Sequence, residues 1–364
     1  MRKLALLALV LATCGDSTPP GFSTGPAATS AAASTSTSGS STGGDTSTGP
    51  ADDSAGDTSA GSSTGILRDV GAPPVDQGTP APVGCQGKVD ILFLISRFGS
   101  MKEEQTQLLA SAAGFVKTIE SKLAGFDVHL MAANPDGDWP GWVCEQGCND
   151  DPQNCAEYGY KCNDYAWLVE ECDEILGAGI TFNAGGHAAN RRCELHGGNR
   201  YILNGQPDLE DAIECIAHGG MSGGDPPMGD ALIAALDPDI NGADGCNAGF
   251  LRKDALLVIV IINDTEDVKS KSWPYQQYNA VVAAKGGDPN AIVVLGVIAQ
   301  PQKGPEVPGC IYDTLGDKYK VRQLLKKFNH HVEGDTCAPS YAPYFDQTVE
   351  LIEKVCADFV PIPG

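Results

Sequence analysis

Positive charge and long apolar runs are both scarce in this chain. Lys and Arg number 24 against 47 Asp and Glu in 364 residues, which gives a formal net charge of −23 at pH 7. Proteins that bind nucleic-acid backbones need clustered Lys and Arg, so this deficit argues against a nucleic-acid partner. After residue 13, no apolar run reaches the roughly 18 residues that a membrane-spanning helix needs. We therefore expect the rest of the chain to be soluble.

Large apolar side chains are almost missing from the segment that follows. Residues 15–65 consist nearly entirely of Ser, Thr, Gly, Ala, Pro and Asp, with Phe22 as their only large apolar residue. Such a segment cannot bury enough surface to offset the entropy lost on ordering. Residues 66–84 continue it with more proline. The composition predicts a disordered tether over residues 14–84.

The first residues have the pattern of an export signal. Residues 1–13, MRKLALLALVLAT, combine two basic residues with an apolar run of signal-peptide length. The sequence Leu-Ala-Thr-Cys that ends at Cys14 resembles the site at which bacteria acylate a cysteine and cleave before it. We expect residues 1–13 to be removed and Cys14 to carry a lipid anchor in the bacterial cell envelope, on the outer membrane or cell surface. Export to the periplasm or medium without a lipid is the alternative.

The cysteines show no zinc-binding pattern. The chain has 13 cysteines, and no two of them have the Cys-x-x-Cys spacing that is common in zinc sites. Apart from Cys14, an even number remain. An even set of cysteines in an exported chain is typical of disulfide bonds. We therefore predict disulfides from Cys85 onward.

From Cys85 onward the chain alternates between apolar strands and amphipathic helices. This order predicts an α/β domain over residues 85–364, with a doubly wound, mostly parallel, Rossmann-like sheet. Segment 255–262 is the most apolar strand, so we expect it at the centre of the sheet. The predicted strands are 89–95, 126–133, 255–262 and 291–298, and the predicted helices are 102–125, 209–220, 228–236, 275–287, 318–328 and 344–359.

One block interrupts this alternation. Residues 136–206 are rich in cysteine and aromatic residues, which predicts a disulfide-stapled insertion between core elements. Aromatic residues on loops are favoured as anchors of binding surfaces, but a small subdomain also needs them for its own core. Both interpretations stay open for the six aromatic residues Trp139, Trp142, Tyr158, Tyr160, Tyr165 and Trp167.

Several long segments resemble one known family. They include VDILFLISRFGSM (89–101), GCNAGFLRKDALLVIVIINDTED (245–267), YNAVVAAKGGDPNAIVVLGVI (278–298) and DTCAPSYAPYFDQTVELIEKVCADFVP (335–361). Together they resemble von Willebrand factor A-type domains, especially those of exported bacterial lipoproteins. The resemblance covers roughly residues 89–361 and matches the insertion only loosely. It implies a Rossmann-like sheet whose strands carry at their carboxyl ends a cation that binds a partner's carboxylate.

The residues at the implied cation site depart from the family pattern. Ser96 stands where the family has its first Asp, Ser100 and Asp264 match, and Asp225 lies near the position of the Thr. Because hard cations are held by many oxygen ligands, we expect a degenerate site that has mostly lost its cation. Weak binding of Mg²⁺ or Ca²⁺ is the alternative. A further hypothesis is that Arg97 replaces the cation by pairing with Asp264.

Three other motifs favour structural roles. Ser222 lies in a Gly-x-Ser-x-Gly motif, but a helix rather than a strand precedes it, so we expect a turn and not a hydrolase nucleophile. The segment starting at Asp237 is similar to a calcium loop, but Ala248 occupies the position of its essential Glu. The adjacent histidines His330 and His331 are expected on the surface at the end of a helix.

The sequence therefore favours a lipid-anchored, non-catalytic module that binds a protein or another envelope-surface ligand without a cofactor. Recognition is expected in the insertion and in the loops at the strand ends. One alternative is an exported metal-dependent enzyme that uses Asp264, Glu266 and Asp267. Another is a purely structural envelope protein.

Overall fold

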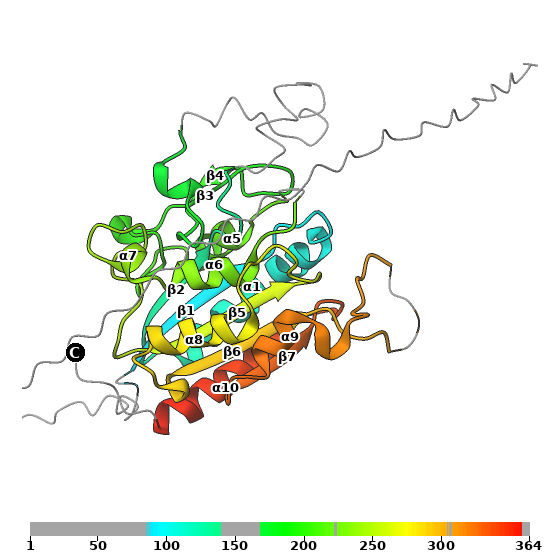
Figure 1. Ribbon diagram of the computed structural model, residues 1–364. Helices are drawn as coiled ribbons and strands as arrows, with labels where there is room; N and C mark the ends of the chain where they lie inside the picture. The colour runs from blue at the N-terminus through cyan, green and yellow to red at the C-terminus, as the bar shows by residue number, and fades with distance from the viewer. Residues whose placement is uncertain are drawn as a thin grey trace, which may run out of the picture. The chain divides into compact units, whose positions relative to one another are not determined.

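The domain is built on one parallel sheet. The computed structural model describes residues 85, 87–139, 168–221, 224–303, 305 and 308–358. Five strands lie in the order β2-β1-β5-β6-β7, and each neighbouring pair is parallel (Figure 1). Phe93 of β1 lies opposite Ala132 of β2 and Val260 of β5. The strands are β1 Lys88–Ile95, β2 Asp127–Ala133, β5 Leu256–Asn263, β6 Ile292–Ile298 and β7 His331–Asp335.

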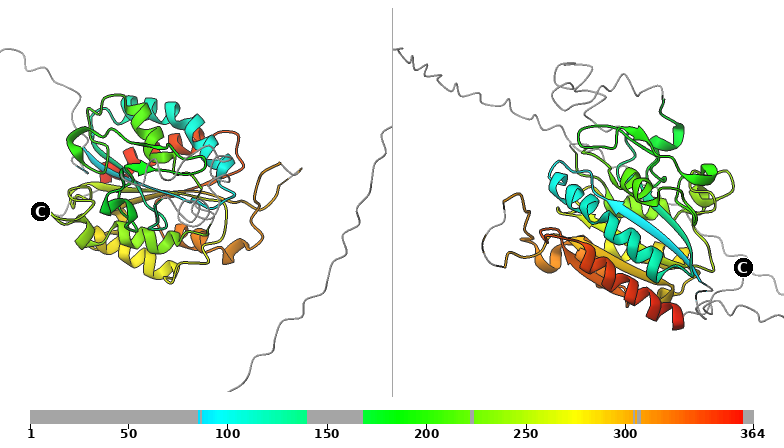
Figure 2. Two further views of the ribbon diagram at one scale, coloured as in Figure 1. Left: turned by 90° about the horizontal axis from the view of Figure 1, so that it is seen from above. Right: turned by 180° about the vertical axis from the view of Figure 1, so that it is seen from behind.

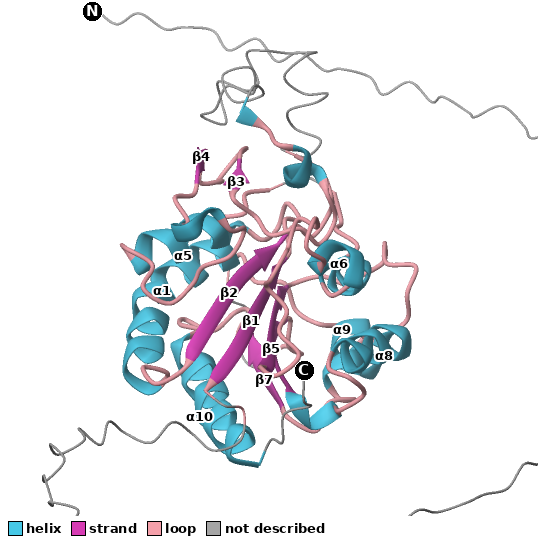
Figure 3. Cartoon of the chain, turned by 90° about the vertical axis from the view of Figure 1, so that its left-hand side faces the viewer, coloured by secondary structure: helices cyan, strands magenta, loops and turns pink. Residues whose placement is uncertain are grey.

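Helices cover both faces of the sheet, as Figures 2 and 3 show. One face packs on α1 Lys102–Lys122, α5 Leu209–Ala217 and α10 Ala342–Asp358. The other packs on α6 Met228–Ala235, α8 Pro274–Ala284 and α9 Lys320–Leu325. The prediction of an α/β fold with a parallel sheet is confirmed. The short helices outside the insertion are α7 Pro238–Asn241, η5 Pro289–Ala291 and η6 Gly316–Lys318.

The strands are apolar on both faces because both faces are buried. In β1, Phe93 joins the core on the α1 side, whereas Leu92 and Leu94 join the core on the α8 side. Every residue of β5 is buried, and β5 is the middle strand, as the sequence predicts. Side chains that alternate between two apolar cores give the unbroken apolar runs from which these strands are recognised.

One strand of the main sheet was not predicted. β7 lies at the edge of the sheet and has the sequence HVEGD, in which four of the five residues are partly or fully exposed. Its polar composition gives no strand pattern. His331 is exposed, but it begins this strand rather than ending a helix, and its Nδ1 lies 2.8 Å from the carbonyl oxygen of Phe328. Helix α9 is correspondingly shorter than the predicted helix at 318–328.

The insertion runs along the outer edge of β2. In its described part it contains η3 Glu171–Glu174, the antiparallel strands β3 Phe182–Asn183 and β4 Arg191–Arg192, and η4 His196–Gly198. Leu130 of β2 exchanges two backbone hydrogen bonds with Ile202, and the Ile180 amide donates to the Ala132 carbonyl at 2.7 Å. These contacts pair backbone groups that an open edge strand would leave exposed.

Four disulfides in the described residues confirm the cysteine prediction in part. Two of them, Cys172–Cys246 and Cys193–Cys215, fasten the insertion to the core, and the others are Cys85–Cys356 and Cys310–Cys337. Disulfides persist in oxidising compartments, which supports export. No helix in the described ranges has the length and apolarity needed to cross a membrane. The signal segment 1–13, Cys14 and the tether 14–84 lie outside the described residues.

Candidate functional site

The loops at the carboxyl edge of the sheet bring Ser100 and Asp264 together. Parallel strands all end at the same edge, and the loop after β1 meets the residue that follows β5. Burial raises the pKa of Asp264 overall, and the nearby Ser100 hydroxyl opposes this rise by favouring the ionised form. The two residues that best match the family's cation site are therefore neighbours in space.

Asp264 is a buried carboxylate whose hydrogen-bonding capacity is largely unused among the described residues. The residue is 1% exposed, and neither carboxylate oxygen accepts a hydrogen bond of standard geometry from a described residue. Burial raises the pKa of Asp264, and the nearby charges of Asp225 and Glu103 raise it further. Asp225 thus lies within electrostatic reach of the site. A buried carboxylate with open lone pairs is costly unless a proton, a cation or a ligand satisfies it.

Glu104 adds a second acid that the sequence analysis did not single out. It lies in the first turn of α1, is 2% exposed, and its Oε2 has no partner among the described residues. Burial, together with the charge of Asp264, raises the pKa of Glu104 to about 7. An acid at the start of a helix normally interacts with solvent and the helix dipole, so the sequence gives no sign of this burial.

Ser96 and Arg97 serve the loop and not the carboxylate. The Ser96 hydroxyl accepts a hydrogen bond from the Phe98 amide at 3.3 Å. Arg97 is 3% exposed; its guanidinium pairs with Asp136 at 3.2 Å and donates to the Asp138 carbonyl at 3.1 Å. The hypothesis that Arg97 pairs with Asp264 is therefore wrong. Successive side chains of an extended segment point to opposite sides, and Arg97 points toward the loop after β2.

Gln105 fastens the loop after β1 to the turn after α5. Its side-chain amide nitrogen donates to the carbonyls of Ser96, at 3.1 Å, and Gly220, at 2.8 Å. Its side-chain oxygen accepts from the Gly220 amide at 3.0 Å. These three bonds hold the start of the loop after β1, which also contains Ser100, in place. Ser222, with its Gly-x-Ser-x-Gly motif, lies outside the described residues.

Asp267 and Glu266, two acids of the enzyme hypothesis, each accept hydrogen bonds from backbone amides of different segments. Asp267 is 3% exposed and accepts hydrogen bonds from the amides of Gly229, at 2.9 Å, and Ser270, at 3.1 Å. Glu266 accepts from the Lys320 amide at 3.1 Å, and burial raises the pKa of Glu266. In the described ranges, no three His, Cys, Asp or Glu side chains are arranged to hold a metal ion. One side-chain oxygen of Asp237 is also engaged locally, since it caps α7 by accepting from the Asp239 amide at 2.9 Å.

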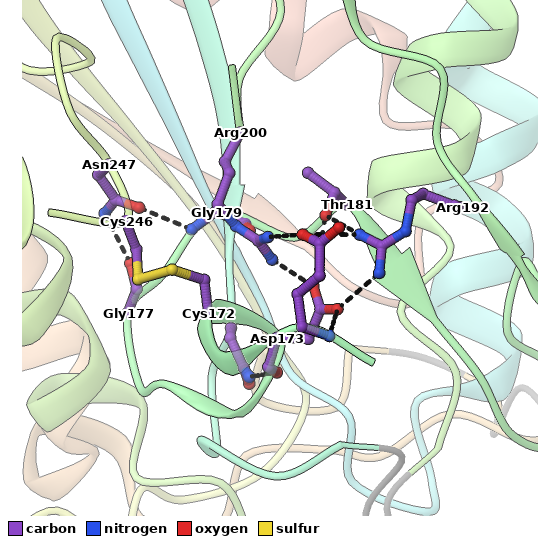
Figure 4. The surroundings of a disulfide bond; sticks show 11 residues. Cys172, Asp173, Gly177, Gly179, Thr181, Arg192, Arg200, Cys246 and Asn247 are labelled. Carbon is purple, nitrogen blue, oxygen red and sulfur yellow. Dashed lines mark hydrogen bonds and ion pairs between the residues drawn. A yellow bond between two sulfur atoms is a disulfide. The ribbon is translucent and has the colours of Figure 1, made fainter. Parts of the chain in front are cut away.

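A buried ionic network supports the insertion (Figure 4). Asp173, next to the Cys172–Cys246 disulfide, pairs with Arg192 at 2.9 Å and with Arg200, and it accepts from the Thr181 hydroxyl at 3.3 Å. Its side chain is fully buried. The described part of the insertion is therefore a rigid extension of the core.

Trp139 belongs to the interior of the insertion. It is 7% exposed and packs on Phe182 with the two ring centroids 5.1 Å apart. Of the two interpretations left open for Trp139, its position favours the structural one, because its ring fills a small apolar cluster of the insertion. The other five candidates, Trp142, Tyr158, Tyr160, Tyr165 and Trp167, lie outside the described residues.

Exposed apolar side chains follow two neighbouring strands of the sheet. The described residues include five large apolar side chains with high exposure, and all five follow β5 or β6. The loop after β6 extends outward from the sheet in Figure 1. We call these five residues the recognition edge: Val268 (60% exposed), Trp273 (57%), Tyr275 (56%), Ile311 (38%) and Leu315 (43%).

Comparison with known proteins does not identify the chain. No protein-family model matches it, and no curated protein is significantly similar to it. The resemblance to A-type domains therefore rests on the quoted segments. The parallel sheet with helices on both faces is compatible with that resemblance and with other α/β folds.

Proposed function

We propose that the chain is an exported, lipid-anchored binding module of the cell envelope that recognises a protein partner and performs no catalysis. One observation carries the proposal. Every large apolar side chain with high exposure in the described part of the chain follows β5 or β6, two neighbouring strands of the sheet. Open α/β sheets bind ligands at the carboxyl ends of their strands, where these residues are. Exposed aromatic residues on a rigid scaffold are typical of interaction surfaces.

The proposed anchor and tether fit this role. A lipid on Cys14 would hold the chain at the membrane, and residues 15–65, if they form the expected tether of 51 residues, would span on the order of 40 Å on average. The domain could thus reach partners beyond the membrane surface. The insertion contributes mainly rigidity in this proposal, since its described part is fastened by Asp173 and two disulfides.

Substitution of the recognition edge tests the proposal. A variant with serine at all five positions is expected to lose at least about tenfold of its binding to envelope proteins retained by the immobilised wild-type chain. The matched control places serine at exposed charged positions on α1 and α10: Lys117, Glu120, Glu350 and Glu353. Both variants should unfold at the wild-type temperature. If the edge variant retains the same partners as the wild type and the control, the proposal is wrong.

A second candidate function is binding of a divalent cation by Ser100 and Asp264. The open oxygens of Asp264 and the unpartnered hydroxyl of Ser100 favour it. Glu104 and Asp225 would add oxygen ligands, and water would complete the coordination of an ion such as Mg²⁺. The cation would supply a positive charge at the carboxyl edge that can attract a partner's carboxylate.

The pH dependence of stability separates the protonated site from the cation site. Glu104 has a folded-state pKa of about 7 against 4.5 for the unfolded chain, so its proton stabilises the fold below pH 4.5 and this stabilisation disappears as the pH rises to about 7. Such a shift corresponds to about 3 kcal/mol. Glu104→Gln should remove this decrease in the free energy of unfolding with rising pH. The smaller decrease due to Asp90, whose pKa burial raises to about 6, should remain.

Mg²⁺ added above neutral pH provides the second half of that experiment. If a cation binds, Mg²⁺ should raise the unfolding temperature of the wild type and leave that of Asp264→Asn unchanged. Ser100→Ala should weaken the effect of Mg²⁺. An unchanged unfolding temperature of the wild type, or an equal rise in Asp264→Asn, would eliminate the second candidate.

A further inference from the structure

The segment from Val268 to Gln276 differs in charge from the rest of this acidic protein. It contains Lys269 and Lys271 and no acidic residue, whereas the whole chain has a net charge of −23. Both lysines are exposed, and so are the apolar side chains of Val268, Trp273 and Tyr275. We call residues 268–276 the docking loop. It combines apolar anchors with positive charge on a single surface segment.

Two buried or half-buried acids fix the first half of this loop. Asp267 accepts hydrogen bonds from the Gly229 amide, at 2.9 Å, and the Ser270 amide, at 3.1 Å. Asp230 of α6 accepts from the amides of Lys271, at 2.9 Å, and Ser272, at 3.0 Å. The hydroxyl of Ser270 in turn accepts from the Asp230 amide at 3.0 Å. Both carboxylates keep their negative charge, and that of Asp230 acts on Lys271, but neither Lys269 nor Lys271 forms a close ion pair with a described residue.

The second half of the loop is fixed by glutamines and by close packing. Gln277, which is 2% exposed, donates to the carbonyl of Ser272 at 3.2 Å and to its hydroxyl at 3.1 Å. A Cβ on Gly229 would lie 1.8 Å from the Gln277 amide nitrogen, so a larger residue there would displace this buried, hydrogen-bonded amide. The side-chain oxygen of Gln276 accepts from the Trp273 amide at 2.8 Å.

Trp273 is held in place while one part of its ring remains open. The Lys320 ammonium lies 5.3 Å from the ring centroid and also donates to the Asp267 carbonyl at 2.8 Å. This cation–π contact fixes the indole against α9, and Trp273 as a whole is still 57% exposed. An exposed aromatic ring that is already ordered loses little entropy when a partner binds. Most flexible surface loops lack this property.

We propose that the docking loop binds an acidic protein segment that carries apolar side chains, an inference that rests on the proposed function and specifies its partner. Lys269 and Lys271 would face the carboxylates of the segment, and Val268, Trp273 and Tyr275 would contact its apolar side chains. An anionic bilayer fits less well, because Trp273 lies against Lys320 instead of projecting as a wedge.

Calorimetric titration of the full chain with three synthetic peptides tests the inference. The first peptide repeats Asp-Glu-Leu, the second repeats Asn-Gln-Leu, and the third repeats Asp-Glu-Ser. We expect binding of the first peptide and at least about tenfold weaker binding of the other two, because each lacks one of the two interactions. Raising the salt concentration should weaken binding of the first peptide.

Variants locate the binding on the docking loop. Trp273→Ala and the double variant Lys269→Glu/Lys271→Glu should each weaken binding of the first peptide at least about tenfold. The matched double variant Lys117→Glu/Lys122→Glu changes two exposed lysines of α1, on the other face of the sheet, and should leave the affinity unchanged. All four substituted lysines are at the surface, so these variants are expected to fold.

Four results would overturn the inference. They are no binding of the first peptide, equal affinity for the first and second peptides, Trp273-dependent binding to phosphatidylglycerol vesicles in place of peptide, and Trp273-dependent self-association of the chain. Failure here is separable from failure of the proposed function. If the five-serine edge variant still loses its captured proteins while the acidic peptide does not bind, the recognition edge is retained and only the partner chemistry is wrong.

Discussion

Replacing Asp173 with alanine is expected to lower the free energy of unfolding by about 3–5 kcal/mol, because it leaves two arginines without a buried partner. The Asp173 side chain is fully buried, and the side chains of Arg192 and Arg200 are 30% and 11% exposed. The substitution also removes the acceptors used by the Thr181 hydroxyl and the Glu170 amide. Chemical denaturation of the full chain measures the change.

Asp211 provides the matched control for Asp173. It also pairs with an arginine, Arg191, at 2.6 Å, but the two side chains are 62% and 42% exposed. Solvent-exposed ion pairs contribute about 0–1 kcal/mol, so Asp211→Ala should have little effect. Equal effects of the two substitutions would show that the insertion is not held by the buried network at Asp173.

The core of the fold is predictable because its strands and helices have strong apolar patterns. The segments at 89–95, 126–133, 255–262 and 291–298 form strands within one or two residues of their predicted bounds. β7 was missed because an edge strand that is partly exposed needs no apolar run. The path of the insertion along β2 was also missed, since it depends on isolated backbone pairs such as Leu130 with Ile202.

Only part of the candidate site is predictable from local sequence. The sequence indicates that Ser100 and Asp264 are neighbours, because each follows the carboxyl end of one of two adjacent parallel strands, β1 and β5. The burial of Glu104, however, depends on how the start of α1 packs. The partner of Arg97 is decided by which side of the strand end it faces, which the sequence does not reveal.

The exposure of the recognition edge is equally invisible in the sequence. Val268 and Trp273 belong to a short segment of mixed apolar and polar residues before a helix, and its sequence has no pattern that indicates which side chains are exposed. Four buried residues on the opposite side of the same segment attach it to the domain by hydrogen bonds, and this leaves Val268 and Trp273 facing solvent. These four residues are Asp267, Ser270, Ser272 and Gln277. Such alternation in a loop becomes clear only when the hydrogen-bond partners on α6 are known.

Photo-crosslinking from Tyr275 in intact cells tests most directly whether the recognition edge binds a partner. A benzophenone amino acid at position 275, which is 56% exposed, is expected to give a discrete covalent adduct with another protein. The same group at the exposed position of Lys117, on α1, is expected to give none. The proposed function predicts that the adduct at position 275 disappears when Trp273 is also replaced by alanine. Adducts from position 117 with none from position 275 would contradict it.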